Sequence, residues 1–229
     1  MYRSFEEKIN DLKNELLKMA SAVELSLHNA IDALKKRDDE LARKVIEEDA
    51  LIDEFETRID NACIELLALQ TPVASDLRLI TSAMKINNDL ERMADHAVNI
   101  AQKTLELNRE KPLKPLIDIP RMAELAQAMV KNAIDAFLHR DSELALSVCK
   151  SDDDVDDLNT QIIRELMTYI AGDPTAVSRA LGLIMISKNI ERIADLATNI
   201  AEEVVFIVEG RTIKHLLGKK ADKARARSE

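Results

Sequence analysis

Apolar side chains recur every three or four positions along most of the chain, which is the spacing of one face of an α-helix. The first such run covers residues 9–34 and follows a Ser4 and Glu7 pair that fits a capping box. A second run begins after Asp38, which is placed to cap it, and a third begins at Thr71-Pro72, a cap followed by a first-turn proline. Because strand-like alternation of apolar and polar residues is absent, we predict an all-α protein.

The second half of the sequence repeats the first. Eleven of seventeen residues are identical between 29–45 and 132–148, and eight of fifteen between 87–101 and 187–201. A period of about 100 residues is too long for the roughly 20–50 residues of a solenoid repeat, so we expect a duplicated domain.

The helical pattern breaks where prolines accumulate between the two halves. We therefore predict two tandem antiparallel three-helix bundles, built from helices of roughly 30–35 residues, or about 50 Å each. In the second bundle, Asp173 with Pro174 marks the start of the last helix and Gly210 its end. The predicted organisation is a first bundle at 1–110, a linker at 111–119, a second bundle at 120–210 and a basic tail at 211–229.

Composition supports long packed helices, since the 229 residues include 4 Gly, 5 Pro and no Trp, and 3% are aromatic. No apolar run approaches the roughly 18–20 residues of a membrane span, and residues 1–7 do not open like a signal peptide. We therefore expect a soluble, cytoplasmic protein. Cys63 and Cys149 are predicted to be small buried apolar residues, with a disulfide or redox pair as the alternative.

The formal net charge is −10, and because the tail contributes +5, residues 1–210 carry −15. An acidic body disfavours nucleic acid as a partner, because such binding depends on neutralising phosphates. It suits cations or basic partner surfaces instead. The tail is expected to be solvated and flexible, and a weak contact with a partner or a membrane surface is the alternative.

Carboxylates four residues apart occur twice in each half, and this spacing places both members of a pair on one face of a helix. Like charges one turn apart repel and slightly destabilise the helix, and this unfavourable spacing occurs in both halves. Four such groups on adjacent antiparallel helices point to a metal ion with oxygen ligands, such as Mg, Ca, Mn or Fe. Asn99 and Asn199 are candidate additional ligands or hydrogen-bond partners. The candidate ligands are Asp49, Asp53, Glu91 and Asp95 in the first half, and Asp152, Asp156, Glu191 and Asp195 in the second.

The alternative is that these pairs lie on solvated faces, neutralised by Arg92, Arg192 or nearby lysines. His96 offers a nitrogen ligand in the first half only, because Leu196 replaces it in the second. The absence of a Glu-x-x-His step argues against a ferritin-like di-iron site. No Gly-rich phosphate loop, nucleophile elbow or zinc spacing is present, so the residues alone predict no reaction.

Four linked motifs stand out in the sequence: Thr71–Arg78, Met84–Ile86, Asp89–Asp95 and Asn189–Asp195. With these motifs, about residues 4–210 resemble the PhoU family of phosphate-signalling proteins. Ala94 and Ala194 replace a glycine that is frequent there, which does not disturb a helix. The segment around Arg179 lacks the Ser-Asp-Leu-Arg sequence of the first copy. Any role of Asp76 and Arg78 is therefore not transferred to the second copy.

The resemblance implies a cytoplasmic accessory protein of the high-affinity phosphate ABC transporter, without catalytic activity. It implies a negative regulator of the phosphate-starvation response that links the transporter's ATPase subunit to a sensor histidine kinase, and we expect a homodimer. It also implies metal clusters at the paired carboxylates, most often of iron, with Mn, Mg or Zn as other candidates. Two alternatives remain open. One is a carboxylate-metal enzyme, either a hydrolase or a redox enzyme, and the other is a metal-storage helical bundle.

Overall fold

The computed structural model describes residues 5–69 and 72–213, and in these ranges the chain is helical with no strand. The all-α prediction is therefore confirmed. The elements are α1 (Phe5–Lys36), α2 (Asp39–Leu69), α3 (Ala74–Leu107), α4 (Asp118–His139), α5 (Ser142–Gly172), a 3-10 turn η1 (Pro174–Ala176) and α6 (Val177–Glu209).

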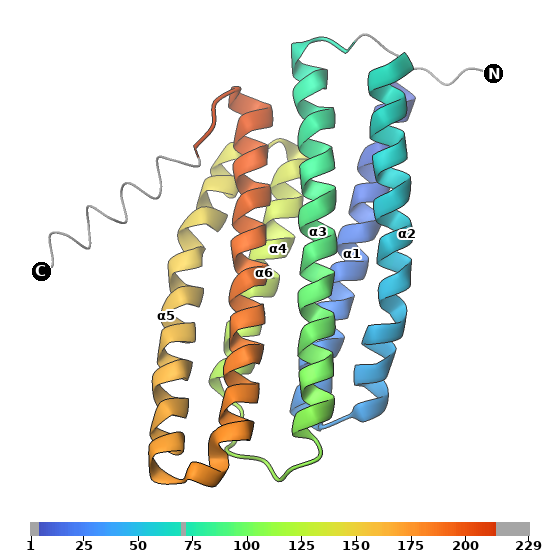
Figure 1. The fold of residues 1–229 in the computed structure, drawn as a ribbon. Coiled ribbons are helices and arrows are strands. Elements are labelled where there is room, and N and C mark those ends of the chain that lie inside the picture. The colour runs from blue at the N-terminus through green and yellow to red at the C-terminus, as the bar shows by residue number, and fades with distance from the viewer. Residues whose placement is uncertain (1–4, 70–71, 214–229) are drawn as a thin grey trace, which may run out of the picture.

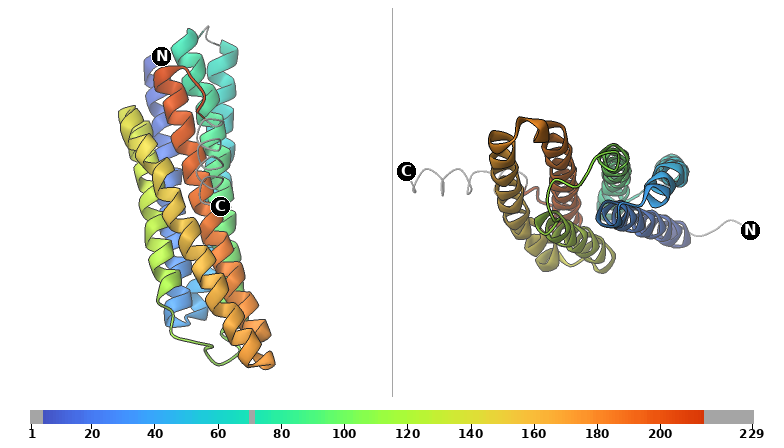
Figure 2. Two further views of the ribbon diagram at one scale, coloured as in Figure 1. Left: turned by 90° about the vertical axis from the view of Figure 1, so that its left-hand side faces the viewer. Right: turned by 90° about the horizontal axis from the view of Figure 1, so that it is seen from below.

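Helices α1–α3 form one antiparallel bundle and α4–α6 form a second, packed against the first (Figure 1). Seen from the end, α5, α6, α3 and α2 follow one another in one layer, with α1 and α4 behind it (Figure 2). Helices α3 and α6 lie side by side at the centre, and α1 also contacts α4. The buried apolar side chains of all six helices form one continuous core. The two bundles therefore share their interior rather than meeting only at the linker.

Polar contacts cross the boundary between α3 and α6 as well. His96 Nδ1 lies 2.8 Å from Asn189 Oδ1, and Ser82 Oγ donates a 2.7 Å hydrogen bond to Glu203. Gly182 on α6 lets Leu107 approach closely, since a Cβ added there would lie 2.8 Å from Leu107 Cδ2. A glycine inside a helix lowers the stability of the helix by about 1 kcal/mol relative to alanine. The close approach of Leu107 accounts for a glycine at position 182.

Most helix ends follow the sequence-based predictions. The side chain of Asp38 accepts a hydrogen bond from the Leu41 amide at 3.0 Å, and Asp173 accepts one from the Thr175 amide at 2.9 Å. Gly210 follows α6 with a φ of 67°, the left-handed conformation typical of a helix C-terminus. Arg37 also has a positive φ, and its guanidinium donates to backbone carbonyls at the end of α3 and the start of the linker, those of Leu107, Asn108 and Glu110.

Three predicted features differ in the structure. Helix α3 begins at Ala74 with Val73 at its cap, so Pro72 precedes the helix instead of occupying its first turn. Pro174 begins a 3-10 turn, and α6 follows it from Val177. Helix α4 has 22 residues against 32 in α1, because residues 108–117, which align with the start of α1, contain two prolines and form the linker.

Ser4, Thr71 and tail residues 214–229 lie outside the described residues, so the predictions made for them concern positions the structure does not describe. Among the described helices, none combines the length and the apolar character needed to cross a membrane. Cys63 is buried and Cys149 is half-buried, and both are free thiols. Burial raises the pKa of Cys63 to about 12 and that of Cys149 to about 11, so both resist ionisation.

Candidate functional site

The carboxylates of the first half lie between α2 and α3. Asp49 and Asp53 come from α2, and Glu91 and Asp95 come from α3, two helices that pack directly on each other. Burial raises the pKa of Glu91 to about 7, and Asp95, Glu56, Asp53 and Asp49 add to the shift in that order. Burial, then Asp53 and Asp95, also raises the pKa of Asp49. The four predicted residues are therefore close enough to repel one another across the two helices. We call this set, together with Glu56, the first acidic groove.

Glu56 is a member of this groove that the sequence analysis missed. It lies three residues after Asp53 on the same face of α2, and its pKa is raised by burial and then by Asp60, Asp53 and Asp95. The residue at the equivalent position of the second half is Asn159, so a search for repeated acidic pairs does not detect it. Its spacing of three from Asp53 is the signal that identifies it.

The second half has a corresponding set between α5 and α6, the second acidic groove, formed by Asp152, Asp156, Glu191 and Asp195. Burial raises the pKa of Asp152 to about 7, followed by repulsion from Asp195, Asp156, Asp153 and Glu191. The pKa of Asp156 is raised by burial and by Glu191 and Asp195, and Lys188 opposes this shift. One buried oxygen of Asp152, Oδ1, has no hydrogen-bond partner.

The two grooves differ in their counter-charges. In the second, Lys188 Nζ lies 2.8 Å from Glu191 and Arg192 lies 2.8 Å from Asp195, while the Asn159 amide donates to Glu191 at 2.9 Å. In the first groove, Asn88 stands where the second half has Lys188.

Arg92, the equivalent of Arg192, lies 3.7 Å from Asp89 instead of pairing with Asp95. Within the described ranges, none of the four predicted ligands of the first groove forms an ion pair. Among the described residues, the paired carboxylates of the first groove therefore have no counter-charge in an ion pair, whereas Lys188 and Arg192 partly neutralise the second groove.

The remaining predicted residues take different places. Asn199 lies beside Asp152 and Asp195 in a shallow depression of about 300 Å³ that Arg92 and Arg192 also line. Asn99 is exposed on α3. His96 lines the same depression as Asn199, but its Nδ1 is engaged with Asn189, so it joins α3 to α6 rather than the first groove.

The carboxylates are not drawn together as a ready ligand set. Among the residues that the structure describes, no three His, Cys, Asp or Glu side chains are gathered closely enough to hold a metal ion. The first groove provides several oxygen donors on two packed helices, and among the described residues no Lys or Arg forms an ion pair with its four predicted ligands. This chemistry fits a hard or borderline cation, and binding requires the exposed or half-buried side chains to rotate toward it.

Comparison with known proteins places both halves in one family. The PhoU domain family model matches residues 16–104 and again residues 119–204. A phosphate-specific transport system accessory protein PhoU homolog from Aquifex aeolicus is 42% identical over 209 residues, which cover 91% of this chain and 95% of that protein.

Two crystal structures share the fold. PhoU from Pseudomonas aeruginosa superposes with a TM-score of 0.88 at 39% identity, covering 91% of this chain and all of that one. The phosphate transport system regulatory protein PhoU from Streptococcus pneumoniae superposes with a TM-score of 0.85 at 27% identity, covering 92% of this chain and all of that one.

The raised pKa values predict how stability depends on pH. Because the folded-state pKa of Glu91 is about 7 and its ordinary value is 4.5, folding favours the protonated form. The free energy of unfolding should therefore fall as pH rises from about 4.5 to about 7. Glu91→Gln should be more stable than the wild type at pH 8, by on the order of 1 kcal/mol after allowance for solvent screening, with little difference near pH 4.5.

Urea denaturation in the presence of chelator at pH 4.5, 6 and 8 measures this effect. Glu47→Gln, at an exposed position on the same pair of helices, is the matched control and should change the free energy of unfolding by less than about 0.5 kcal/mol. A Glu91→Gln protein that is no more stable than the wild type at pH 8 would contradict the raised pKa of Glu91 and its cause in burial and carboxylate repulsion.

Proposed function

Because the chain belongs to the PhoU family, we propose that it regulates phosphate uptake as an accessory protein of a phosphate-specific transport system. The observation that carries this proposal is the match of the PhoU domain to both halves, with relatives that the chain spans almost completely. These relatives are named as accessory or regulatory proteins, and this chain is likewise not an enzyme.

In its finer form, the proposal is that the protein acts in the cytoplasm as a negative regulator. It would couple the ATPase subunit of the phosphate transporter to a sensor histidine kinase by binding both. This role needs surfaces for protein contact, and α6 offers one: Val177, Leu181 and Met185 recur every four residues with exposed fractions of 37%, 48% and 50%. A row of exposed apolar side chains on one helix face supports docking of a partner protein or of a second copy in a homodimer.

The proposal includes a metal ion in the first acidic groove, held by Asp49, Asp53, Glu91 and Asp95, with Glu56 as a further donor. Burial, and after it repulsion from the neighbouring carboxylates, raises the pKa of Glu91, and a bound cation would offset both. The oxygen donors of the groove suit iron, manganese or magnesium, with zinc as another candidate. In the second groove a cation must displace Lys188 and Arg192 from Glu191 and Asp195. We therefore propose that the first groove binds metal more tightly than the second.

Deleting the gene in its native host should raise the expression of phosphate-starvation genes in high phosphate, because a negative regulator is lost. Restoring the wild-type gene should restore repression. A Leu181→Glu, Met185→Glu double variant should fail to do so, because two charges would interrupt the apolar face of α6, while Leu25→Glu, at a 56% exposed site on α1, serves as the control and should restore repression. A transcriptional reporter measures each strain, and unchanged expression in the deletion strain would count against the proposed role.

The metal proposal predicts unequal effects from matched substitutions in the two grooves. A Glu91→Gln, Asp95→Asn protein should lose most of its bound metal after loading with Fe²⁺ or Mn²⁺ and removal of excess. The equivalent Glu191→Gln, Asp195→Asn protein should keep most of it, and binding by both should weaken as pH falls toward 5 because protons compete for the carboxylates. Elemental analysis of the purified proteins measures the content. Equal metal in the wild type and both variants would leave the grooves as acidic surfaces without a metal function.

A further inference from the structure

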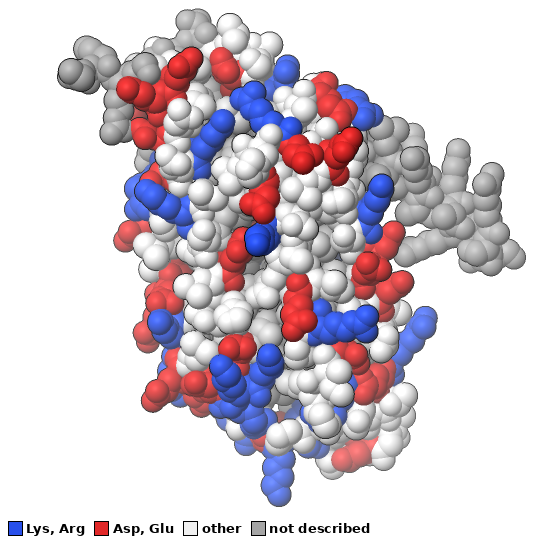
Figure 3. All heavy atoms as spheres, turned by 180° about the vertical axis from the view of Figure 1, so that it is seen from behind, with Lys and Arg blue, Asp and Glu red and all other residues white. Residues whose placement is uncertain are grey.

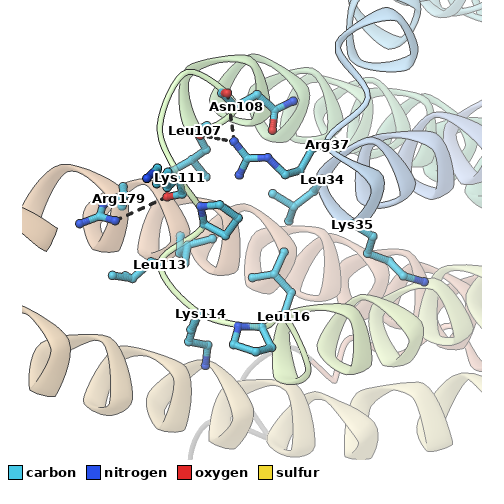
Figure 4. A pocket seen from close by; sticks show the side chains of 13 residues that line it. Leu34, Lys35, Arg37, Leu107, Asn108, Lys111, Leu113, Lys114, Leu116 and Arg179 are labelled. Atoms are coloured by element: carbon cyan, nitrogen blue, oxygen red, sulfur yellow. Dashed lines mark hydrogen bonds between the residues drawn. The ribbon is translucent and has the colours of Figure 1, made fainter.

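A cavity of about 350 Å³ lies at the end of the molecule where the linker crosses from one bundle to the other (Figure 4). Four separate segments enclose it: the ends of α1 and α3, the linker, and the start of α6. None of the acidic groove residues lines it. It is therefore a feature of the linker end, distinct from the carboxylate sites.

The interior of this cavity is apolar. Leu34, Leu107 and Leu183 come from three different helices, and Leu113 and Leu116 come from the linker, which also contributes Pro112 and Pro115. Figure 4 shows Leu34 and Leu116 toward the middle of this space, with Lys35, Lys114 and Arg179 around it. Such a volume falls within the range of small-molecule sites, and the leucines give a bound molecule a surface that excludes water.

Its rim is cationic, with five Lys or Arg residues and no acidic residue among the described lining: Lys35, Arg37, Lys111, Lys114 and Arg179. This composition is unusual for a chain with a net charge of −10. On the face shown in Figure 3, Lys and Arg side chains are interspersed with Asp and Glu, and several of them lie at the lower end, where the linker crosses.

Several of these cations keep the capacity to bind an anion. Arg37 donates to backbone carbonyls rather than to a carboxylate, so its full charge is retained. Arg179 forms an ion pair with Glu110 at 3.6 Å through its Nε, which makes no hydrogen bond with the described residues, and it donates a 3.5 Å hydrogen bond to the Lys111 carbonyl through a terminal nitrogen. Lys111 is exposed, and no ion pair holds its side chain in the described structure. Lys114 is paired with Glu165 and Lys35 with Asp32, so Arg37 and Lys111 are the rim cations without an ion pair among the described residues.

We propose that this cavity binds a small organic anion, with its anionic head among Arg37, Lys111 and Arg179 and its apolar body between the leucines and prolines. Charge complementarity selects the head, because a guanidinium or ammonium group binds phosphate or carboxylate through charge-assisted hydrogen bonds. The apolar interior selects the body, because it gives no hydrogen bonds to a small, strongly hydrated ion such as inorganic phosphate. This site is independent of the proposed function, since it uses none of the residues of the acidic grooves.

The position of the cavity gives binding a structural consequence. A ligand in it contacts α1 and α3 of the first bundle, α6 of the second and the linker between them. It therefore stabilises the packing of the end of α3 against the start of α6, where Gly182 meets Leu107. Bound ligand should raise the melting temperature of the whole chain.

Isothermal titration of the full-length protein with octyl phosphate, below its micelle concentration, tests the site. We expect one saturable site per chain, with affinity that rises at least tenfold from ethyl to octyl phosphate because the longer chain buries more apolar surface. Inorganic phosphate and the uncharged octyl glucoside should each bind at least tenfold more weakly than octyl phosphate. Octanoate in place of octyl phosphate distinguishes a phosphate head from a carboxylate head.

Lys111 and Lys150 provide a matched pair of variants, since both are exposed and neither forms an ion pair in the described structure. Lys111→Glu should weaken octyl phosphate binding by about tenfold, Lys111→Arg should restore it, and Lys150→Glu should leave it within about twofold of the wild type. The melting temperature of each unliganded variant verifies folding. The proposal is overturned if neither octyl phosphate nor octanoate binds saturably, if octyl glucoside binds equally well, or if the Lys111→Glu and Lys150→Glu proteins lose binding equally.

Discussion

Helices α3 and α6 pack antiparallel along the centre of the molecule, and the other functional features are placed relative to that contact (Figure 2). Each helix buries one face against the other and the remainder of its inner surface against its own bundle. The first acidic groove lies between α3 and α2, and the second lies between α6 and α5. The linker cavity lies at one end of the α3 and α6 pair, where Leu107 packs closely against Gly182. A shift of one helix along the other would therefore alter the cavity and the relation between the grooves together.

Duplication explains why the halves look alike, and a few substitutions explain why they differ chemically. Both halves keep two carboxylate pairs in equivalent places, at the local cost of like-charge repulsion. The second half then replaces Asn88 by Lys188 and Glu56 by Asn159, which adds a cation and removes an acid. Arg192 forms an ion pair with Asp195, whereas its equivalent in the first half, Arg92, forms one with Asp89. These differences leave the four paired carboxylates of the first groove without an ion pair among the described residues, whereas two cations partly neutralise the second.

Periodicity and capping were sufficient to predict the helices and most of their ends, because Asp38 and Gly210 act through contacts a few residues away in the chain. Asp173 caps the 3-10 turn that precedes α6, so the start of α6 was predicted too early. The start of α3 and the length of α4 were not predicted correctly, since a proline is compatible with either a first helical turn or the segment before it. Within the candidate site, spacing identified the paired carboxylates, but the search for repeats passed over Glu56. The linker cavity has no local signal, because its walls come from four segments that meet only in the folded chain.

The central claim is that the contact between α3 and α6 makes the duplicated halves a single folding unit. Differential scanning calorimetry of the full chain, free of metal and added ligand, tests it most directly. The shared core predicts one transition with equal calorimetric and van't Hoff enthalpies. Two resolved transitions, or a calorimetric enthalpy about twice the van't Hoff value, would show that the halves unfold separately and would contradict the account.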